Sequence, residues 1–443
     1  PLVLDTPLGP ILAGIHALGN LRECAWGVYL TKTLVEDALT KFRPQFKPCE
    51  PNMSVQSVAR TLGPLHPKSV FRYISSGTCE VYGTFVGWRS TLKSRVRASY
   101  IGEAVCERLK VEIQHGAPVM KGWMPWRIAA TDMVHPTTAI PSVELEACVT
   151  AFKNDIDRLL PQSEFDLIHI LDLDTTINGA PGVKFINKMP RDTSMGFPWK
   201  CSKKKHMIDS PSERHTDGMT FEPEVMERVT LCISLYKAGF RYMAIFTAHL
   251  KDEATKWKKI LLGKTRVFTG APADWSIVVR QYFLSCVRVI QRNKHIFEAG
   301  PGTNPQSVEW EMIGEYLTQH GSHKMIAGDY ASFDKSMPPS VILAAFDVLI
   351  HLCKKGGYSE EDLKVCWGIA YDTAFPLVDF HGDLVQFYGS NPSGHPLTVI
   401  INGLANSLYM RYCYKQLSPR NECDSFKENV ALMTYGDDNV MGV

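Results

Sequence analysis

The amino-acid sequence predicts a mixed fold of α-helices and β-strands. Apolar residues recur at helical spacing in several segments, and short apolar runs bounded by turn residues occur in others. The chain has 443 residues, of which 45% are hydrophobic and 21% charged, a composition typical of globular proteins and unlike that of disordered ones. At roughly 100–200 residues per domain, this length allows two to four domains.

Charge and cysteine content exclude several classes of protein. The formal net charge is +2, from 48 basic and 46 acidic residues, so any attraction to nucleic acid or a membrane must be local. No uncharged apolar run reaches the roughly 18 residues of a transmembrane helix, and no signal peptide is evident. The 12 cysteines are scattered without a C-x-x-C pair, which argues against structural zinc and for free thiols in a reducing compartment.

The expected elements follow in chain order. Two apolar runs separated by a turn predict a β-hairpin over residues 1–20. Five prolines at positions 44–67 indicate a linker. The middle of the chain is mixed, with helical spacing at 142–160 and 223–239. After residue 320 the pattern predicts a strand, a helix, a loop, a second helix and a hairpin.

Acidic residues end two of the expected strands. Asp329 follows the run 323–328, and Asp334 lies on the turn after it, before a helix expected from Ser340 to Leu352. The run 430–435 leads into Gly436-Asp437-Asp438-Asn439, which is turn chemistry. An isolated Asp-Asp pair in a turn is usually structural. A second strand-end acid favours a site for Mg²⁺, which binds carboxylates together with substrate phosphates.

These acids lie in recognisable motifs. Residues 328–334 (Gly-Asp-Tyr-Ala-Ser-Phe-Asp) and 435–438 (Tyr-Gly-Asp-Asp) resemble the first and third palm motifs of the RNA-dependent RNA polymerases of positive-strand RNA viruses, in the picorna-like form. The resemblance implies that Asp329, Asp437 and Asp438 are catalytic and bind two Mg²⁺ ions, with Mn²⁺ as an alternative. Two such ions can activate an attacking hydroxyl and stabilise a leaving pyrophosphate.

A loop and a helix lie between these two motifs. Residues 390–396 form the loop, and apolar residues from Leu397 to Tyr412 recur at helical spacing. Thr398 and Asn402 are four residues apart and therefore share a face of that helix. Taken alone, such a polar pair usually faces solvent.

The spacing Ser-Gly-x3-Thr-x3-Asn in this segment resembles the second palm motif of the same family, in the expected order. The resemblance implies that matching residues recognise the incoming nucleotide through the ribose 2′-hydroxyl, because a buried amide left unpaired by deoxyribose discriminates strongly. The nucleotide-binding residues implied are Asp334, Ser393, Gly394, Thr398 and Asn402.

A basic block lies between residues 251 and 266. It holds six cations and two acids, a net charge of +4, so the rest of the chain carries −2. Such a block is often a solvated surface segment. Its sequence nevertheless resembles the finger motif that roofs the nucleotide channel, which implies that Lys251, Lys264 and Arg266 contact the triphosphate. Residues 81–83, 93–96 and 193–199 also resemble finger segments, which would track the template.

The amino-terminal hairpin has a resemblance of its own. Residues 9–20 resemble the last hairpin of the chymotrypsin-like cysteine proteases encoded just before these polymerases, and His16 would line the pocket that reads a substrate glutamine. The alternative is a plain hairpin with a satisfied histidine. No protease activity is expected. Gln56-Ser57 is the expected protease–polymerase junction, with Gln45-Phe46 as a weaker choice.

The expected fold class is α+β. The resemblance implies a right-hand polymerase with fingers and a palm, the antiparallel palm sheet flanked by helices, and the thumb missing. The expected domains are a protease remnant (1–45), a linker (46–68), fingers with part of the palm (69–320) and a palm truncated after the Gly-Asp-Asp hairpin (321–443).

The function implied is RNA-directed RNA polymerisation that replicates a positive-strand viral genome, within a polyprotein. The implied partners are RNA template and primer, nucleoside triphosphates, a protein primer and other viral replication proteins, in the host cytoplasm at membrane-associated replication complexes. The alternatives are a reverse transcriptase, which should lack the Ser-Gly-x3-Thr-x3-Asn motif, and a non-catalytic RNA-binding remnant. By itself the chain is expected not to polymerise.

Overall fold

A computed structural model describes residues 2–6, 9–19, 25–29, 62–74, 79–86, 93–134 and 139–443 of the chain. The chain divides into two compact units, Pro1–Pro48 and Cys49–Val443. Within the described ranges, no helix is long and apolar enough to cross a membrane. The ten described cysteines are all free thiols, as the scattered cysteine pattern predicts.

The first unit contains a three-stranded antiparallel sheet in the order β1-β2-β3. The strands are β1 (Leu2–Thr6), β2 (Gly9–Gly19) and β3 (Ala25–Tyr29). Pairing of Thr6 with Gly9 through Leu2 with Gly14 confirms the hairpin predicted over residues 1–20. The backbone of His16 lies in β2, whereas its side chain is outside the described part of the structure.

The second unit contains a six-stranded sheet in the order β11-β9-β13-β14-β5-β4. Its strands are β4 (Leu62–Gly63), β5 (Cys79–Phe85), β9 (Ile245–Leu250), β11 (Val267–Gly270), β13 (Leu377–Phe380) and β14 (Asp383–Phe387). Only β9 and β13 pair in parallel. The sheet joins strands from both sides of residue 320, so the expected boundary between fingers and palm is not a break in the sheet.

The strand β4 falls inside the segment expected to be a linker. It pairs with β5, and the side chain of Leu62 packs against the buried residues Met243, Ile245 and Leu384. This apolar packing explains why the last part of the expected linker belongs to the sheet. Residues 46–61, with the expected junction, lie outside the described ranges.

The third sheet carries the acidic hairpin. Its strands are β12 (Met325–Gly328), β15 (Ala431–Tyr435) and β16 (Asp438–Gly442), all antiparallel in the order β12-β16-β15. This confirms the predicted strand, hairpin and antiparallel sheet. Two short pairs complete the strands, β6 (His115–Gly116) with β10 (Thr255–Lys256) and β7 (Met207–Asp209) with β8 (Met219–Phe221).

Helices surround these sheets. The longer helices are α3 (Gly102–Leu109), α4 (Met124–Val134), α5 (Ser142–Leu159), α8 (Pro223–Lys237), α10 (Ala273–Arg292), α12 (Val308–Thr318), α14 (Pro339–Lys355), α15 (Glu360–Ala374) and α16 (Thr398–Leu417). The shorter ones are α6 (Gln162–Phe165), α7 (Leu173–Asn178), α9 (Trp257–Leu261), α11 (Lys294–Phe297), α13 (Phe333–Ser336), α17 (Phe426–Asn429), η1 (Val70–Arg72) and η2 (Lys203–Lys205). The helices predicted at 142–160, 223–239 and 340–352 are confirmed as α5, α8 and α14.

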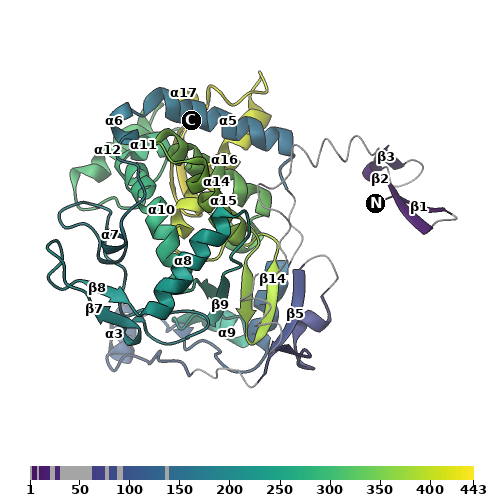
Figure 1. Ribbon diagram of the computed structural model, residues 1–443, viewed down its shortest axis with the longest axis vertical. Coiled ribbons are helices and arrows are strands. Elements are labelled where there is room, and N and C mark those ends of the chain that lie inside the picture. The colour runs from purple at the N-terminus through teal and green to yellow at the C-terminus, as the bar shows by residue number, and fades with distance from the viewer. Residues whose placement is uncertain are drawn as a thin grey trace. The chain divides into compact units, whose positions relative to one another are not determined.

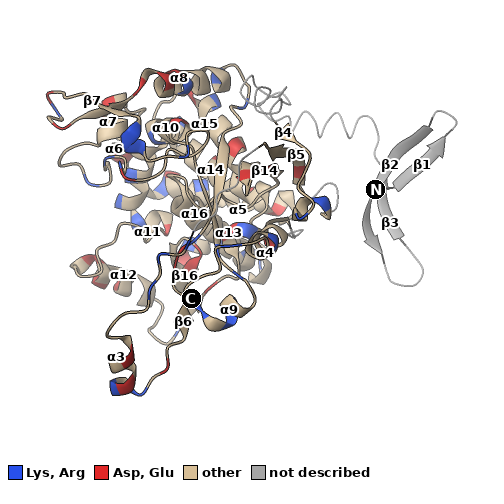
Figure 2. Cartoon of the chain, turned by 90° about the horizontal axis from the view of Figure 1, so that it is seen from below, with Lys and Arg blue, Asp and Glu red and all other residues tan. Residues whose placement is uncertain are grey.

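The core of the second unit lies where α14 packs against α5, α10, α15 and α16 (Figure 1). Phe152, Phe283 and Phe346, from three of these helices, are fully buried. Helix α16 is buried on all sides from Ile400 to Leu408. Basic and acidic residues are interspersed over the unit (Figure 2).

Candidate active site

The three acids of the palm motifs lie at one end of the third sheet. Gly328 at the end of β12 pairs with Asn439, and Tyr435 pairs with Asp438 across the hairpin. Asp329 directly follows Gly328, so the register brings it to the Gly-Asp-Asp turn, as the motifs predict. Asp329, Asp437 and Asp438 are all exposed. In the described part of the chain, no group of three or more His, Cys, Asp or Glu side chains is arranged to hold a metal ion.

The side chain of Asn406 on α16 is hydrogen-bonded to the Gly-Asp-Asp turn. The motifs in the sequence did not single out this residue. Its fully buried amide nitrogen donates to the carbonyl oxygens of residues 436–438 at 3.1 to 3.3 Å. Its oxygen accepts hydrogen bonds from the hydroxyl of Tyr330 (3.2 Å) and the amide of Asn439 (3.4 Å). Asn406 therefore joins the first motif to the third. The sequence did contain a signal for Asn406: it lies four residues after Asn402, as Asn402 lies four residues after Thr398, so the three share a helix face.

The predicted pair of Asp334 and Asn402 is confirmed. The amide nitrogen of Asn402, on α16, donates to the Asp334 carboxylate, on α13. Burial raises the pKa of Asp334; the hydrogen bond from Asn402 opposes this shift, and the charge of Asp437 adds to it. The site thus concentrates negative charge beside a buried amide.

The loop of the second motif is attached to β11. The backbone N–H of Ser393 donates to the Thr269 hydroxyl (3.3 Å), and the backbone N–H of Thr269 donates to the Ser393 hydroxyl (3.4 Å). The N–H of Ala271 donates to the carbonyl of Gly394 (3.0 Å). A Cβ atom on Gly394 would lie 2.5 Å from the Thr269 carbonyl oxygen, so only glycine fits this approach.

Thr398 holds the same loop to the start of α16. Its hydroxyl donates to the carbonyl of Pro392 (2.9 Å) and accepts from the backbone N–H of His395 (3.1 Å). The structure therefore uses this hydroxyl within the loop, and Thr398 also lines the cavity described below; its implied part in nucleotide binding stays a prediction.

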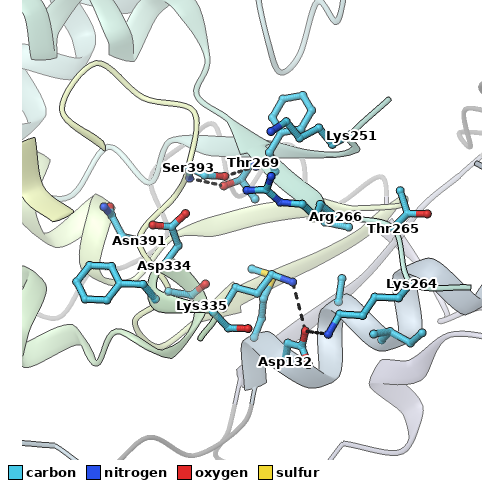
Figure 3. Close-up of a pocket in the computed structure, with 18 of the residues that line it drawn as sticks. Asp132, Lys251, Lys264, Thr265, Arg266, Thr269, Asp334, Lys335, Asn391 and Ser393 are labelled. Carbon is cyan, nitrogen blue, oxygen red and sulfur yellow. Dashed lines mark hydrogen bonds and ion pairs between the residues drawn. The ribbon is translucent and has the colours of Figure 1, made fainter. Parts of the chain in front are cut away.

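A cavity of about 920 Å³ brings most of the predicted residues together (Figure 3). Its wall includes acids and polar groups of the palm motifs and cations of the basic block. The predicted residues that line it are Lys251, Lys264, Arg266, Asp334, Ser393, Thr398 and Asp437. Asn402 reaches it through Asp334.

Four further charged residues line the cavity although the sequence did not assign them to the site: Asp132, Lys258, Lys259 and Lys335. Asp132, on α4, lies between Lys264 (3.8 Å) and Lys335 (3.5 Å), as Figure 3 shows. Burial lowers the pKa of the Lys335 ammonium, and Asp132 opposes that shift. The sequence signal for Lys335 was its place next to Asp334, whereas nothing local distinguished Asp132.

The two acids of the basic block also have partners, and one of them pairs with two of its cations. Glu253 accepts from Lys251 at 2.9 Å and from Arg266 at 3.2 Å. Asp252 accepts from the hydroxyl of Ser94 and the backbone N–H of Arg95, both at 2.6 Å. These bonds connect residues 93–96, one of the segments predicted to belong to the fingers, to the basic block.

Comparisons with known proteins point to the same family as the three palm motifs. Residues 127–443 match the family described as viral RNA-dependent RNA polymerase. The chain is 31% identical to the replicase polyprotein of Drosophila C virus (62% of this chain, 16% of that protein). It is 30% identical to the RNA1 polyprotein of Andean potato mottle virus (62% and 38%) and 25% identical to the replicase polyprotein of cricket paralysis virus (98% and 25%).

The fold has a counterpart among solved structures. A Sicinivirus 3Dpol RNA dependent RNA polymerase superimposes with a TM-score of 0.64 at 17% identity, over 80% of this chain and 70% of that one. The chain spans only 10% to 38% of the length of the curated relatives that it matches. Since the family match covers most of the chain and includes all three palm motifs, the chain belongs to the viral RNA-dependent RNA polymerase family.

Proposed function

We propose that this chain carries the active site of an RNA-directed RNA polymerase that copies a positive-strand viral genome. The observation that supports this most directly is one cavity lined by Asp437, by Asp334 with its partner Asn402, and by the cations Lys264 and Arg266. The reaction is attack of the 3′-hydroxyl of the growing strand on the α-phosphate of the incoming nucleotide, with release of pyrophosphate.

The cations and the polar residues of the cavity would bind different parts of the nucleotide. Lys251 and Lys264 supply point charges to the triphosphate, and Arg266 can make planar two-pronged contacts with it. Glu253 pairs with Lys251 and Arg266, and Asp132 pairs with Lys264; nucleotide phosphate would replace these acids as the partner of the three cations. Asp334 and Asn402 face the ribose.

Asp329, Asp437 and Asp438 would hold the divalent metal ions. The chemistry of these side chains suits Mg²⁺ or Mn²⁺, because carboxylates supply hard oxygen ligands and all three acids lie at one end of the third sheet. The charge of Asp437 also helps to raise the pKa of Asp334, a sign of negative potential that a cation would relieve. When bound, such ions activate the attacking hydroxyl and stabilise the leaving pyrophosphate.

The test is primer extension by the mature polymerase with Asp437→Asn. We expect nucleotide addition to be abolished while the thermal unfolding midpoint is retained, and Mn²⁺ binding measured by calorimetry to weaken. Asp424→Asn, at an exposed acid outside the cavity, is the matched control and should extend primers normally. Near-normal turnover by Asp437→Asn would contradict the assignment.

The same assay separates the alternatives. A reverse transcriptase would extend a primer with deoxyribonucleotides at least as well as with ribonucleotides, and an RNA-binding remnant would bind RNA without extending it. The Asp334–Asn402 pair supports the RNA polymerase, because a buried amide beside this carboxylate could pair with a 2′-hydroxyl and would be left unpaired by deoxyribose.

The remaining assignments are also part of the proposal. The antiparallel sheet of β1–β3 supports a protease remnant over residues 1–45, with His16 on β2. RNA template and primer, nucleoside triphosphates, a protein primer and other replication proteins would be the partners, at membrane-associated complexes in the host cytoplasm. Amino-terminal sequencing of the mature polymerase tests the Gln56-Ser57 junction.

A further inference from the structure

A chain of buried hydrogen bonds leads away from the Asp334–Asn402 pair into the loop of the second motif. The oxygen of the Asn402 amide accepts from the amide nitrogen of Asn391 at 2.7 Å. The oxygen of Asn391 in turn contacts Nε2 of His395 at 3.1 Å, and Nδ1 of His395 contacts the backbone N–H of Leu397 at 3.2 Å. At most 8% of the surface of Asn391, Asn402 or His395 is exposed.

The direction of this chain follows from its last member. A backbone N–H can only donate, so Nδ1 of His395 accepts and carries no proton. The proton of the neutral ring is then on Nε2, which donates to Asn391. Burial keeps the ring neutral, since it lowers the pKa of His395 to about 3.

Each following amide is then oriented in turn. Asn391 must turn its oxygen to His395 and its nitrogen to Asn402. Asn402 must therefore turn its oxygen to Asn391 and its nitrogen to the Asp334 carboxylate, as observed. The opposite orientation of Asn402 would set its oxygen against the carboxylate, two acceptors with no proton between them.

We propose that Asn391 and His395 are positioning residues that fix the orientation of the Asn402 amide and thereby the selection of ribose over deoxyribose. This inference rests on the proposed polymerase function. Asn391 precedes the predicted motif, and His395 occupies one of its unspecified positions. The loop has other attachments, through Ser393 to Thr269 and through Thr398 to Pro392, so the chain can be broken while the loop stays docked.

The sharpest perturbation is Asn391→Asp in the mature polymerase. The new carboxylate still accepts from His395 but cannot donate to Asn402, so Asn402 must turn its nitrogen toward position 391 and its oxygen toward Asp334. We expect the ratio of kcat/KM for ribonucleotide to that for deoxyribonucleotide to fall about tenfold, through the ribonucleotide value. Asn421→Asp is the control, because its exposed oxygen accepts from Lys415 in either form.

Two further variants distinguish a loss of amide orientation from a general loss of folding. His395→Phe keeps a ring against Trp275 but removes both ring nitrogens, and a selectivity loss of about fivefold is expected. Asn391→Asp in an Asn402→Ala background should cause no further loss of selectivity, because the positioned amide is absent. Unchanged selectivity in both single variants, or additive losses in the double variant, would overturn the proposal.

A measurement without turnover separates this proposal from the polymerase function. In nuclear magnetic resonance spectra with ¹⁵N-asparagine, the Asn402 side-chain amide should exchange slowly with solvent in the wild type and lose this protection in His395→Phe. An enzyme that fails to extend primers but shows this change would contradict the proposed function alone. Unaltered protection would contradict the positioning role whatever the activity.

Discussion

Asn406→Leu should both destabilise the protein and slow nucleotide addition. The leucine has similar volume and suits the helix, so the main effect is the loss of hydrogen bonds. The Asn406 nitrogen has two protons for the carbonyls of residues 436–438, and its oxygen accepts from Tyr330 and Asn439. Four bonds at about 1 kcal/mol each give about 4 kcal/mol. Rehydration of the carbonyls of exposed Asp437 and Asp438 reduces the expected loss to about 2–4 kcal/mol.

Urea denaturation gives the change in unfolding free energy, and single-nucleotide incorporation gives the change in rate. We expect ribonucleotide and deoxyribonucleotide incorporation to slow alike, by at least about tenfold, because the turn that carries Asp437 loses its support. The control is Asn429→Leu, because Asn429 is exposed and, among the described residues, its amide donates to just the Tyr414 hydroxyl and the Ser425 carbonyl. A variant at Asn406 as stable and as fast as this control would refute the reasoning.

Three other substitutions test separate parts of the structure. Asn402→Ala should lower ribonucleotide incorporation by about tenfold and deoxyribonucleotide incorporation far less; equal losses in kinetic assays would mean that it only supports the fold. Gly394→Ala should raise the KM for nucleotide severalfold, because its Cβ would lie 2.5 Å from the Thr269 carbonyl oxygen. Arg411→Met should cost about 3–5 kcal/mol in urea denaturation, because it leaves Glu298 buried without its main partner. Burial alone would raise the pKa of Glu298, but Arg411 and Lys427 lower it to about 2; wild-type stability should therefore decline as pH falls from about 4.5 toward 2, and less steeply in Arg411→Met.

The sequence predicted those helices and turns that are determined by residues close together in the chain. The apolar spacing of residues 142–160 and 340–352 gave α5 and α14, and the turn residues after 435 gave the hairpin of β15 and β16. The order of the three motifs was enough to predict that Asp334 and Asn402 meet, although 68 positions separate them.

Contacts between residues that are far apart in the sequence and belong to no motif could not be predicted in this way. The strand β5 pairs with β14 about three hundred positions later, and neither strand carries a pattern that names its partner. Asp132 meets Lys264 and Lys335 only because α4 lies beside the cavity. Asn391 and His395 sit in a loop whose hydrogen bonds depend on burial, and burial is a property of the whole fold.

The polar side of α16 explains how one buried helix can organise the site. Thr398 holds the loop at Pro392, Asn402 holds Asp334, and Asn406 holds the turn at 436–438. Successive members are four residues apart, or about 6 Å along the axis at 1.5 Å per residue. The helix thus sets the spacing between the loop, Asp334 and the Gly-Asp-Asp turn.

Helix α16 also packs so closely against β15 that there is little room for a larger side chain between them. A Cβ atom on Gly403 would lie 3.0 Å from the hydroxyl of Thr434 on β15, so the helix and the strand are already in close contact there. Any displacement of α16 from β15 would move Thr398, Asn402 and Asn406 together, because they belong to one rigid element. A substitution such as Gly403→Ala should therefore impair sugar selection and turnover in parallel, whereas changes at Asn402 or Asn406 alone separate the two.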